Sequence, residues 1–465
     1  MSQANGEAYD AIVIGSGQGG GPLATALARG GRKTALVERK WVGGSCINYG
    51  CTPTKTMIAS ARVAYLARRG ADFGVATGPV RVDLARVRQR KRDIVESFRT
   101  GSERRIVQTP GVDLIFGEAS FAGPHTVQVA PTDGEPRRLA APIICINTGL
   151  RPVEPRIEGI DRVPTLDSTA IQELDEVPEH LVVLGGGYIG VEFGQMFRRF
   201  GARVTIIQHG AHLLDREDSD VSDEVAKILR EDGIDVLLSS EAQRAEVGAG
   251  GRVLLSVRTP DGERRLDGSH VLKATGRAPD VAALNLSAAG IATTDRGAIR
   301  VNDRLETSVP GVYAMGDVKG GPAFTHISYD DFRVLRTNLV DGGSASIAGR
   351  IVPYTVFMDP QLGRVGATET EARNAGRPIR VAKMPMSWIA RALEVDESRG
   401  FIKVVVDGES DQILGCAALG LEGGELMAMI EIAMMGHLPF TALRDGIFAH
   451  PTLAEAWNNV FSEFQ

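Results

Sequence analysis

The sequence contains only four cysteines in 465 residues, too few for the disulfide scaffold that holds small secreted domains together. It also lacks any apolar run near the roughly 18 residues that a membrane-spanning helix needs. The first ten residues, MSQANGEAYD, have neither the basic start nor the apolar core of an export signal. We therefore expect a cytoplasmic protein without a membrane partner.

An excess of positive charge is also absent, because the net charge is −6. A dedicated nucleic-acid binder needs a basic surface for phosphate contacts, so the composition argues against that class. Residues 86–105 are an exception to this negative net charge, because they contain eight basic and three acidic residues. Charge runs of this kind usually form a solvated helix face, and we interpret this one in that way.

The sequence does have the composition of a globular protein, with 43% hydrophobic and 24% charged residues. Its length exceeds one ordinary core. A strand pattern at residues 11–15 leads through a glycine cluster into a helical pattern, and a second strand pattern ends at Glu38. The same order returns over residues 180–208. Two such βαβ units predict an α/β fold with two Rossmann-like dinucleotide-binding domains.

The pattern divides the chain into four predicted domains, with the boundaries 1–150, 151–276, 277–348 and 349–465. A glycine- and serine-rich stretch near Asp341–Gly349 has the composition of a linker before the last domain. That domain mixes strand and helical patterns and is predicted to be α+β. Two long helices are expected earlier in the chain, at residues 53–69 and 84–107.

The first glycine cluster reads Gly15-Ser16-Gly17-Gln18-Gly19-Gly20. Gly15 permits a tight turn, Gly17 lets a pyrophosphate approach the backbone, and Gly20 lets the helix pack on the strand. The phosphates then lie at a helix N-terminus, where free N–H groups and the helix dipole favour anions. Glu38 stands where an acid accepts hydrogen bonds from ribose hydroxyls. The pattern predicts a dinucleotide site, with a structural glycine turn as the alternative.

The second cluster reads Gly185-Gly186-Gly187-Tyr188-Ile189-Gly190, with Gly185, Gly187 and Gly190 in the same three roles. The position that corresponds to Glu38 holds Gln208. A carboxylate there would bond an NAD ribose and repel the 2′-phosphate of NADP, whereas an amide does not repel it. His209 and Arg216 are candidates for nearby positive charge. We therefore expect NADPH as coenzyme, with NADH as the alternative.

Cys46 and Cys51 are the first and last residues of the segment CINYGC, which lies just before the helix expected from Pro53. Cys51 should therefore lie near a helix N-terminus, where the dipole stabilises a thiolate. Lys55 would add positive charge one turn later. Two close thiols of low pKa are what dithiol–disulfide exchange requires. Half of a zinc site and two structural thiols are the alternatives.

The remaining two cysteines do not extend this pair. Cys145 (in IICINTG) and Cys416 (in ILGCAALG) lie in apolar strand patterns, where a thiol is normally buried and inert. A zinc site at Cys46 and Cys51 would need a second Cys/His cluster, which the sequence lacks. We therefore expect no bound metal ion.

The segment GGSCINYGCTPTK, residues 43–55, resembles the redox motif of the class I pyridine nucleotide–disulfide oxidoreductases. That family includes dihydrolipoamide dehydrogenase, glutathione reductase, mycothione reductase and mercuric reductase. Further motifs extend the resemblance over essentially the whole chain: NTGLRP (147–152), GGGYIGVEFG (185–194), ATGRAPD (274–280), VYAMGDV (312–318), DPQLGRVGATE (359–369) and AHPTLAEAWN (449–458).

This resemblance implies an assignment for each predicted domain. Residues 1–150 would bind FAD and carry the redox-active disulfide, and residues 151–276 would bind NAD(P)H. Residues 277–348 would complete the FAD site, and residues 349–465 would form the interface of a homodimer. The implied partners are a second copy of the chain and a small-molecule disulfide or metal-ion substrate, with no nucleic acid.

The resemblance also implies the residues that carry the disulfide chemistry. Cys46 would be the interchange thiol that meets the substrate, and Cys51 the thiol against the flavin. His450 would be the acid–base group, held by Glu455 and contributed by the other subunit. Without the family motifs, a histidine before a proline is more often a residue at a helix start.

Other residues would surround the cofactors. Lys55 and Glu192 would form an ion pair beside the reactive flavin nitrogen, and Tyr188 would be the mobile ring that covers the nicotinamide pocket. Asp317 would bind the ribityl chain of FAD. The predicted cofactor-binding set is completed by two further residues, His326 and Gly276. Taken singly, these residues would be read as surface charges, a core aromatic ring and turn residues.

Some segments distinguish this chain within the family. SYDDFRVLRTNL (328–339) and PMSWIARALEVDESRGFIKVVVD (385–407) resemble the mercuric-reductase-like branch, yet the final residues NNVFSEFQ lack that enzyme's second cysteine pair. Phe448 replaces a histidine that is frequent in lipoamide enzymes. The His450–Glu455 pair suits proton transfer to a thiol leaving group, which metal reduction does not require.

We therefore predict an FAD-dependent NAD(P)H:disulfide oxidoreductase. Hydride would pass from NAD(P)H to FAD, and electrons would pass through the Cys46–Cys51 disulfide to a small disulfide substrate. One alternative keeps the scaffold but reduces a metal ion, Hg(II) or Cu(II). Another is a flavoprotein of low turnover that serves as a redox sensor or binding module. The bulky Tyr49 and Trp388 would either shape the substrate entrance or only pack.

Overall fold

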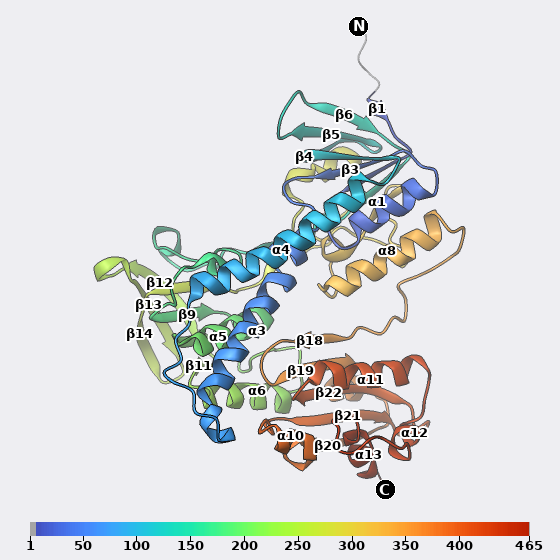
Figure 1. Cartoon of the computed structure of the whole chain (residues 1–465). Helices are drawn as coiled ribbons and strands as arrows, with labels where there is room; N and C mark the ends of the chain where they lie inside the picture. The colour runs from blue at the N-terminus through green and yellow to red at the C-terminus, as the bar shows by residue number, and fades with distance from the viewer. Residues whose placement is uncertain (1–5, 465) are drawn as a thin grey trace. The chain divides into compact units, whose positions relative to one another are not determined.

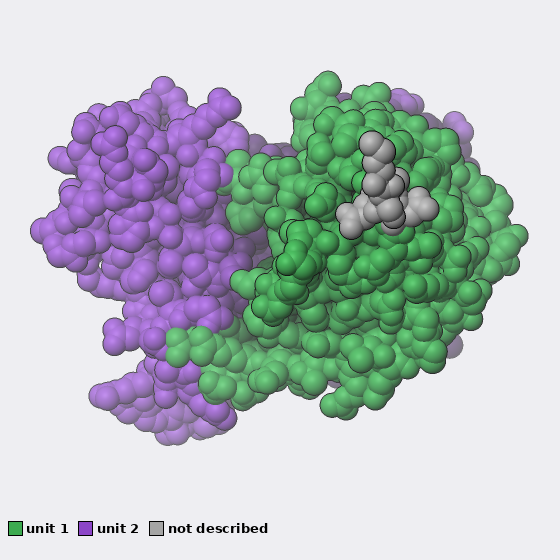
Figure 2. All heavy atoms as spheres, turned by 90° about the horizontal axis from the view of Figure 1, so that it is seen from above, with its two compact units in different colours: residues 1–56, 88–153, 276–350 green, residues 57–87, 154–275, 351–465 purple. Residues whose placement is uncertain are grey.

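The computed structural model describes residues 6–464 and comprises two compact units. The units are coloured separately in Figure 2, and each combines three segments that lie far apart in the sequence. The first unit is formed by residues 1–56, 88–153 and 276–350, and the second by residues 57–87, 154–275 and 351–465. None of the helices in the described part of the chain is long and apolar enough to cross a bilayer.

The first unit is built on a mixed eight-stranded sheet with the strand order β1-β6-β5-β4-β3-β2-β7-β17. These strands are β1 (Glu7–Ala8), β2 (Ala11–Ile14), β3 (Thr34–Glu38), β4 (Val112–Gly123), β5 (Thr126–Pro131), β6 (Arg137–Ala140), β7 (Ile143–Ile146) and β17 (Val312–Ala314). β2 pairs in parallel with β3 and β7, and all four of its residues are buried. A strand buried on both faces explains the unbroken apolar run AIVI.

Two helices of this unit pack side by side, α1 (Gly20–Arg29) and α8 (Thr325–Leu339) (Figure 1). Their shared core contains Leu23, Leu27, Phe332 and Leu335. The apolar residues of α1 recur at helical spacing, so one face of the helix is buried. This packing places the N-terminus of α1 at the carboxyl end of β2, where the first glycine cluster lies.

The second unit contains a parallel four-stranded sheet with the order β11-β10-β9-β15. Its strands are β9 (His180–Leu184), β10 (Arg203–Ile207), β11 (Asp235–Leu237) and β15 (His270–Lys273). Helices α5 (Tyr188–Phe200) and α6 (Ser219–Glu231) connect these strands, and a three-stranded antiparallel sheet follows, made of β12 (Glu241–Val247), β13 (Val253–Thr259) and β14 (Gly262–Gly268). β9, α5 and β10 form the second βαβ unit that the sequence predicted.

The same unit also contains an antiparallel five-stranded sheet with the order β18-β19-β22-β21-β20. Its strands are β18 (Tyr354–Val356), β19 (Gln361–Gly366), β20 (Ile379–Pro385), β21 (Phe401–Asp407) and β22 (Ile413–Gly420). The accompanying helices are α9 (Glu369–Asn374), α10 (Ala390–Glu394), α11 (Gly423–Met435), α12 (Phe440–Arg444) and α13 (Ala456–Ser462). Trp457 and Phe461 of α13 are completely buried in the core of this part. Strands and helices therefore form the predicted α+β arrangement.

Most predicted elements agree with the structure, and the α/β architecture is confirmed. The helix expected at residues 84–107 is α4 (Leu84–Val107). Its basic side chains are mostly exposed or half-buried, as expected, but Lys91 is only 3% exposed, so the interpretation as a solvated face is wrong at that residue. The last helix, α13, begins at Ala456. The four domain boundaries stay a prediction.

The region of the cysteine pair differs from expectation in two ways. A short helix, α2 (Gly44–Asn48), was not predicted, and α3 (Cys51–Arg68) begins two residues earlier than expected. The chain turns between them at Gly50, whose N–H bonds the Ser45 carbonyl at 2.6 Å. A Cβ at residue 50 would lie 2.8 Å from that same oxygen. Only glycine permits so close an approach, and the turn makes Cys51 the first residue of α3.

Candidate active site

The first glycine cluster forms the tight turn that its sequence predicted. Gly15 has a φ of +96°, and a Cβ on Gly20 would lie 1.9 Å from the Gly15 carbonyl oxygen. Asn147 supports this turn, because its Oδ1 accepts a hydrogen bond of 3.0 Å from the Gly20 N–H and lies 2.9 Å from where a Cβ of Gly17 would stand. Asn147 also donates through Nδ2 to the Met315 carbonyl at 3.0 Å. The sequence analysis did not single out Asn147, although it lies in the quoted motif NTGLRP.

Glu38 is held beside this turn at the end of β3. Its Oε2 accepts hydrogen bonds from the N–H and the hydroxyl of Ser16, at 3.0 and 2.7 Å. Its Oε1 accepts one from the Lys40 N–H at 2.9 Å. The carboxylate is therefore oriented by backbone and side-chain donors rather than by packing, and it stays half-buried.

The second cluster repeats this construction with an amide in place of the carboxylate. Gly185 has a φ of +107°, and a Cβ on Gly190 would lie 1.9 Å from the Gly185 oxygen. Gln208 accepts a hydrogen bond of 3.0 Å from the Gly186 N–H, as Glu38 does from Ser16. Its Nε2 donates to the His212 carbonyl at 3.1 Å. The side chain at this position is thus neutral and only 5% exposed.

The cysteine pair lies at the junction of α2 and α3. Cys46 belongs to α2 and shares a hydrogen bond with Cys51, and this bond, together with burial, raises the pKa of the Cys46 thiol. Nearby Lys55 and Thr325 act in the opposite direction on the same thiol. The raised pKa disfavours a thiolate at Cys46, whereas the N-terminus of α3 favours one at Cys51.

Thr325 is a neighbour of the pair that sequence reasoning missed. Its Oγ1 lies 3.4 Å from Sγ of Cys51, within hydrogen-bonding distance for sulfur. Thr325 is the first residue of α8 and stands 274 residues after Cys51, so no local pattern joins them. The neighbouring His326, predicted to bind a cofactor, stacks its ring on Phe324 at 5.4 Å between centroids.

Asp317 and Thr148 provide polar groups for a ligand. Asp317 is half-buried; burial raises the pKa of its carboxyl, and the charges of Arg277 and Lys319 oppose that rise. The hydroxyl of Thr148 is buried and lacks a partner within residues 6–464. Thr148 directly follows the Asn147 that supports the first glycine turn. Such groups normally bond a partner, which suits a polar ligand beside this turn.

The predicted residues of the second unit lie on α5 and near α13. Tyr188 is the first residue of α5, and burial raises the pKa of its phenol. Glu192, one turn later, is 6% exposed and accepts a hydrogen bond of 2.9 Å from the Phe357 N–H. Lys55 belongs to the first unit and Glu192 to the second, so their ion pair stays a prediction.

His450 and Glu455 are joined directly, just before α13. Nδ1 of His450 lies 2.8 Å from Oε2 of Glu455. The histidine side chain is 71% exposed, whereas the glutamate is 19% exposed. The imidazole is therefore oriented by a partly buried carboxylate and turns its other nitrogen toward the outside of its own chain. That arrangement permits a proton carrier for a reaction at a protein surface.

The other two cysteines are buried, as predicted. Burial raises the pKa of both thiols to about 12, so neither ionises near neutral pH.

Two further glycines belong to the predicted cofactor-binding set. Gly276 follows β15 with a φ of +118° and is exposed, and Gly187 directly precedes α5. Residues 6–464 contain no group of three or more His, Cys, Asp or Glu side chains placed to hold a metal ion.

Two glycine turns at the ends of parallel strands and a hydrogen-bonded dithiol at a helix start are typical of flavin-linked disulfide oxidoreductases. Comparison with known families makes the assignment specific. The family described as pyridine nucleotide-disulphide oxidoreductase matches residues 9–331, and its dimerisation domain matches residues 352–461. The chain belongs to the pyridine nucleotide-disulphide oxidoreductase family.

Several characterised relatives resemble the chain over nearly its whole length. The probable pyridine nucleotide-disulfide oxidoreductase RclA of Escherichia coli is 39% identical over 98% of this chain and 99% of that protein. A dihydrolipoyl dehydrogenase of Haloferax volcanii is 36% identical over 96% and 94%, and a mercuric reductase of Staphylococcus aureus is 32% identical over 96% and 81%.

Solved structures of RclA resemble the fold closely. The structure of the HOCl-induced flavoprotein disulfide reductase RclA from E. coli has a TM-score of 0.89 and 38% identity, covering 98% of this chain and 100% of that one. A Cu(II) complex of the same protein has a TM-score of 0.89 and 38% identity, covering 99% and 100%. The predicted family, fold class and enzyme class are confirmed.

The chain is therefore an oxidoreductase that uses FAD and NAD(P)H and carries a dimerisation domain. The residues of the first glycine turn fit FAD. Gly17 and Gly20 leave no room for a Cβ, and the Glu38 carboxylate is an acceptor beside the turn. The Thr148 hydroxyl is buried without a hydrogen-bond partner among residues 6–464, and Asp317 offers a half-buried carboxyl. Bound FAD supplies the chemistry that passes electrons from NAD(P)H to a protein disulfide.

Proposed function

We propose that this enzyme reduces a small disulfide at Cys46, with Cys51 facing the flavin. The observation that carries this proposal is the 2.8 Å contact between His450 and Glu455. A disulfide substrate releases a thiolate that must be protonated, and an imidazole oriented by a carboxylate supplies that proton. Reduction of a metal ion has no such leaving group.

The thiol chemistry follows from the proton arrangement in the pair. The raised pKa of Cys46 disfavours its thiolate, so a base would assist its attack on the substrate, and His450 would take the thiol proton. The Cys46 sulfur then bonds one substrate sulfur, and the other leaves as a thiol with the proton from His450. The Cys51 thiolate would then attack Cys46, which forms the Cys46–Cys51 disulfide and releases the second substrate sulfur as a thiolate that takes a proton from water. NAD(P)H returns the two electrons through the cofactor.

His450 would act on the cysteine pair of the partner subunit in a homodimer. This part of the proposal is supported by the dimerisation domain over residues 352–461 and by the exposure of His450 on its own chain. The protein would act in the cytoplasm on a small molecule rather than a nucleic acid, in agreement with its net charge of −6. Cys46, Cys51, His450 and Glu455 would thus form one site from two chains.

NADPH is proposed as the preferred coenzyme. Gln208 takes the place at the second turn that Glu38 takes at the first, and its amide carries no charge to repel a 2′-phosphate. His209 and Arg216 are exposed nearby in the chain and are available to an anion. Tyr188 would cover the nicotinamide, while Lys55 and Glu192 would lie beside the flavin. His326, Asp317 and Gly276 would complete the cofactor contacts.

A second candidate substrate is the Cu(II) ion. The observation in its favour is the solved Cu(II) complex of RclA, which shares 38% identity and the fold with this chain. Cu(II) would then be a substrate that accepts electrons from the reduced thiols. Both candidates use the same cysteine pair, so they differ in whether His450 is needed.

Steady-state oxidation of NADPH separates the candidates. The FAD-loaded enzyme is assayed with a panel of small disulfides and, separately, with Cu(II) and Hg(II). Fast turnover with a disulfide that is lost in His450→Ala supports the proposal. Turnover with a metal ion alone, unchanged in His450→Ala, favours the second candidate. Absence of turnover with every compound would contradict both and indicate a redox sensor.

A further inference from the structure

A pocket of about 640 Å³ lies in the second unit, and its lining includes none of the residues of the redox site. Its volume falls in the range of roughly 300–1,000 Å³ that small-molecule sites occupy. Its lining comes from the ends of α3 and α5, the end of α6 and the segment before β21: Tyr65, Arg68, Arg69, Arg198, Arg199, Gly201, Glu231, Asp232, Asp396, Glu397, Ser398 and Arg399. Five arginines from three distant segments thus face four carboxylates.

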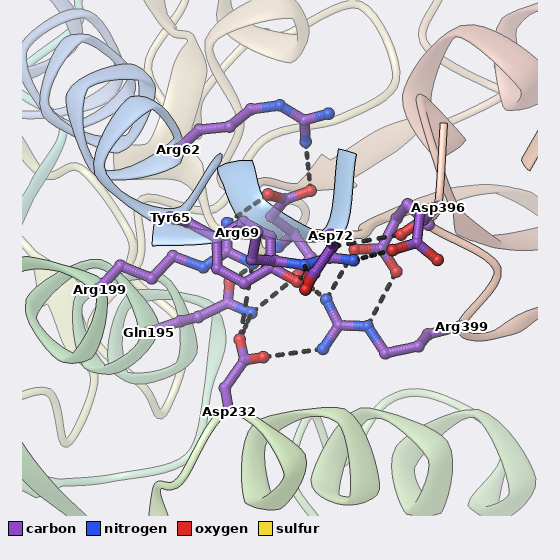
Figure 3. Close-up of polar contacts among 11 residues, drawn as sticks. Arg62, Tyr65, Arg69, Asp72, Gln195, Arg199, Asp232, Asp396 and Arg399 are labelled. Atoms are coloured by element: carbon purple, nitrogen blue, oxygen red, sulfur yellow. Dashed lines mark hydrogen bonds and ion pairs between the residues drawn. The ribbon is translucent and has the colours of Figure 1, made fainter. Parts of the chain in front are cut away.

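Three of these arginines are already matched with carboxylates (Figure 3). Arg199, 5% exposed, bonds the Asp359 carboxylate and the Asp359 carbonyl, and its guanidinium stacks on the Tyr65 ring at 3.9 Å. Arg399 bonds Asp232 at 2.8 Å. It also bonds both carboxylate oxygens of Glu397, each at 2.8 Å.

Arg69 completes the matched set through its bond to Asp396. The carboxylates of Asp232, Asp396 and Glu397 are therefore engaged by these partners, and Glu231 lies 3.9 Å from Lys227. Little negative charge is left in the pocket for any additional cation.

The other two arginines have no carboxylate partner among residues 6–464. Arg68 donates through Nη1 to the Arg199 carbonyl. Arg198 donates to the carbonyls of Asp232 and Ala202, at 2.9 and 3.3 Å. These bonds use only part of each guanidinium, and within the described chain the Nη2 groups of both have no acceptor. Arg68 and Arg198 are therefore two charged side chains of the pocket that form no ion pair among residues 6–464.

A third donor in the pocket is also unused. Nε of Arg199 is buried and has no hydrogen-bond partner within residues 6–464. A buried N–H of a charged group without an acceptor costs free energy, so such groups normally bond a ligand or water. The pocket thus combines one buried donor without a partner, Nε of Arg199, with N–H groups of Arg68 and Arg198 that bond no acidic side chain among residues 6–464.

We propose that this pocket binds a small phosphate-bearing anion through Arg68, Arg198 and Arg199. Guanidinium groups suit a tetrahedral oxyanion, because their planar N–H groups pair with two oxygens at once. The anion would supply the missing acceptors and neutralise the two unmatched charges. The site does not depend on the proposed substrate, since it contains none of the cysteines, glycine turns or His450.

The pocket is lined by the ends of two helices that also carry predicted site residues. Its lining includes Arg68 and Arg69 at the end of α3, and Arg198 and Arg199 at the end of α5. α3 begins at Cys51, and α5 begins at Tyr188. Because helix C-termini carry partial negative charge, the arginines at these two helix ends, and not the helix dipoles, would attract the anion.

The proposal is tested on the FAD-loaded protein saturated with NADP⁺, so that the coenzyme site is filled. Inorganic phosphate, pyrophosphate and ADP are titrated by calorimetry, with the thermal unfolding midpoint as a second measurement. We expect saturable binding of one anion per subunit. Tighter binding of pyrophosphate or ADP than of phosphate would identify a diphosphate ligand, and equal binding would identify a single phosphate group.

Variants decide whether the arginines are responsible. Arg68→Gln and Arg198→Gln should each lower the affinity by about tenfold, since each removes a charged donor. Arg258→Gln is the matched control, because Arg258 lies in the same unit, is exposed and bonds Glu241 at 2.6 Å. The Arg258→Gln variant should bind the anion with the affinity of the wild type. No saturable binding, or equal binding in all three variants, would overturn the proposal. Arg68 is exposed, so its variant decides the matter if Arg198→Gln fails to fold.

Discussion

The ring of Tyr188 packs against the ring of Tyr354, with 5.5 Å between centroids and 37° between planes. The position of Tyr354 is fixed by its hydroxyl, which donates a hydrogen bond to Glu217. Glu217 lies 3.3 Å from Nε of Arg364, and both side chains are almost completely buried. Burial raises the pKa of Glu217, and the guanidinium of Arg364 opposes that rise. Tyr188 therefore rests against a ring that cannot easily move.

This contact predicts an effect on coenzyme binding. If Tyr188 has to swing aside for the nicotinamide, it must give up an aromatic pair worth about 0.5–1.5 kcal/mol. Tyr354→Ala removes that contact, so we expect KM for NADPH to fall roughly 2–10-fold. Tyr354→Phe is the matched control, since it loses the hydroxyl and its bonds to Glu217 and Tyr188 but keeps the ring. A KM that rises in Tyr354→Ala, or falls equally in both variants, contradicts a role of the ring.

Gln208 is predicted to set the coenzyme preference. Gln208→Glu keeps the acceptor for the Gly186 N–H and adds one negative charge. Even where solvent screens part of the interaction, one unfavourable charge pair with the 2′-phosphate costs about 1–2 kcal/mol. We expect kcat/KM for NADPH relative to NADH to fall by roughly 5–30-fold. Gln208→Ala removes the amide without adding charge and should leave the ratio nearer the wild type. A wild type that strongly prefers NADH would refute the assignment.

The roles of the two thiols can be read from the absorption spectrum of the FAD-loaded protein. A thiolate against an oxidised flavin gives long-wavelength absorbance, and Cys51 is predicted to be that thiolate. Cys46→Ser should therefore show the band without prior reduction, and Cys51→Ser should never show it. Cys416→Ala, at a buried thiol, should behave as the wild type does. Identical spectra of the Cys46 and Cys51 variants would mean that their roles are wrongly assigned.

His450 is predicted to serve thiol exchange alone. Removing a general acid–base group typically costs about 10²–10⁴-fold in rate. His450→Ala should therefore lose most disulfide turnover, while the rate of flavin reduction by NADPH, measured by stopped flow, stays unchanged. Glu455→Gln keeps a hydrogen-bonding group beside the imidazole and should lose less. Slower flavin reduction in His450→Ala would show that this residue has another role.

Mixed dimers test whether the site is built from two chains. A Cys46→Ser subunit paired with a His450→Ala subunit leaves one complete site, with the histidine of the first and the cysteine of the second. Such dimers, purified by two different tags, should recover about half of the wild-type activity, although both parent homodimers are nearly inactive. Dimers that remain flavin-loaded but recover nothing would place the whole site within one chain.

The local features of the site could be predicted because they depend on a few neighbouring residues. Gly15 and Gly185 take up positive φ values that favour glycine, and both were expected from the sequence. Cys51 was expected at the start of a helix, although the turn at Gly50 moved that start two residues earlier. The place of Gln208 followed from counting along the chain, because βαβ units have a nearly constant length.

Contacts between distant segments could not be predicted in this way. Asn147 supports a turn 127 residues away, and Thr325 contacts a thiol 274 residues away. No sequence pattern around either residue predicts the residue that it contacts. The same holds for Tyr354 beside Tyr188.

The sequence by itself determined the α/β class, the two glycine turns and the cysteine pair at a helix start. These follow from backbone conformation and hydrophobic period over a few residues. Only the tertiary structure decided which side chains surround them, including the ring behind Tyr188 and the arginine-lined pocket. Such neighbours are chosen when whole helices and sheets pack to bury their apolar faces, and that packing joins residues far apart in the chain.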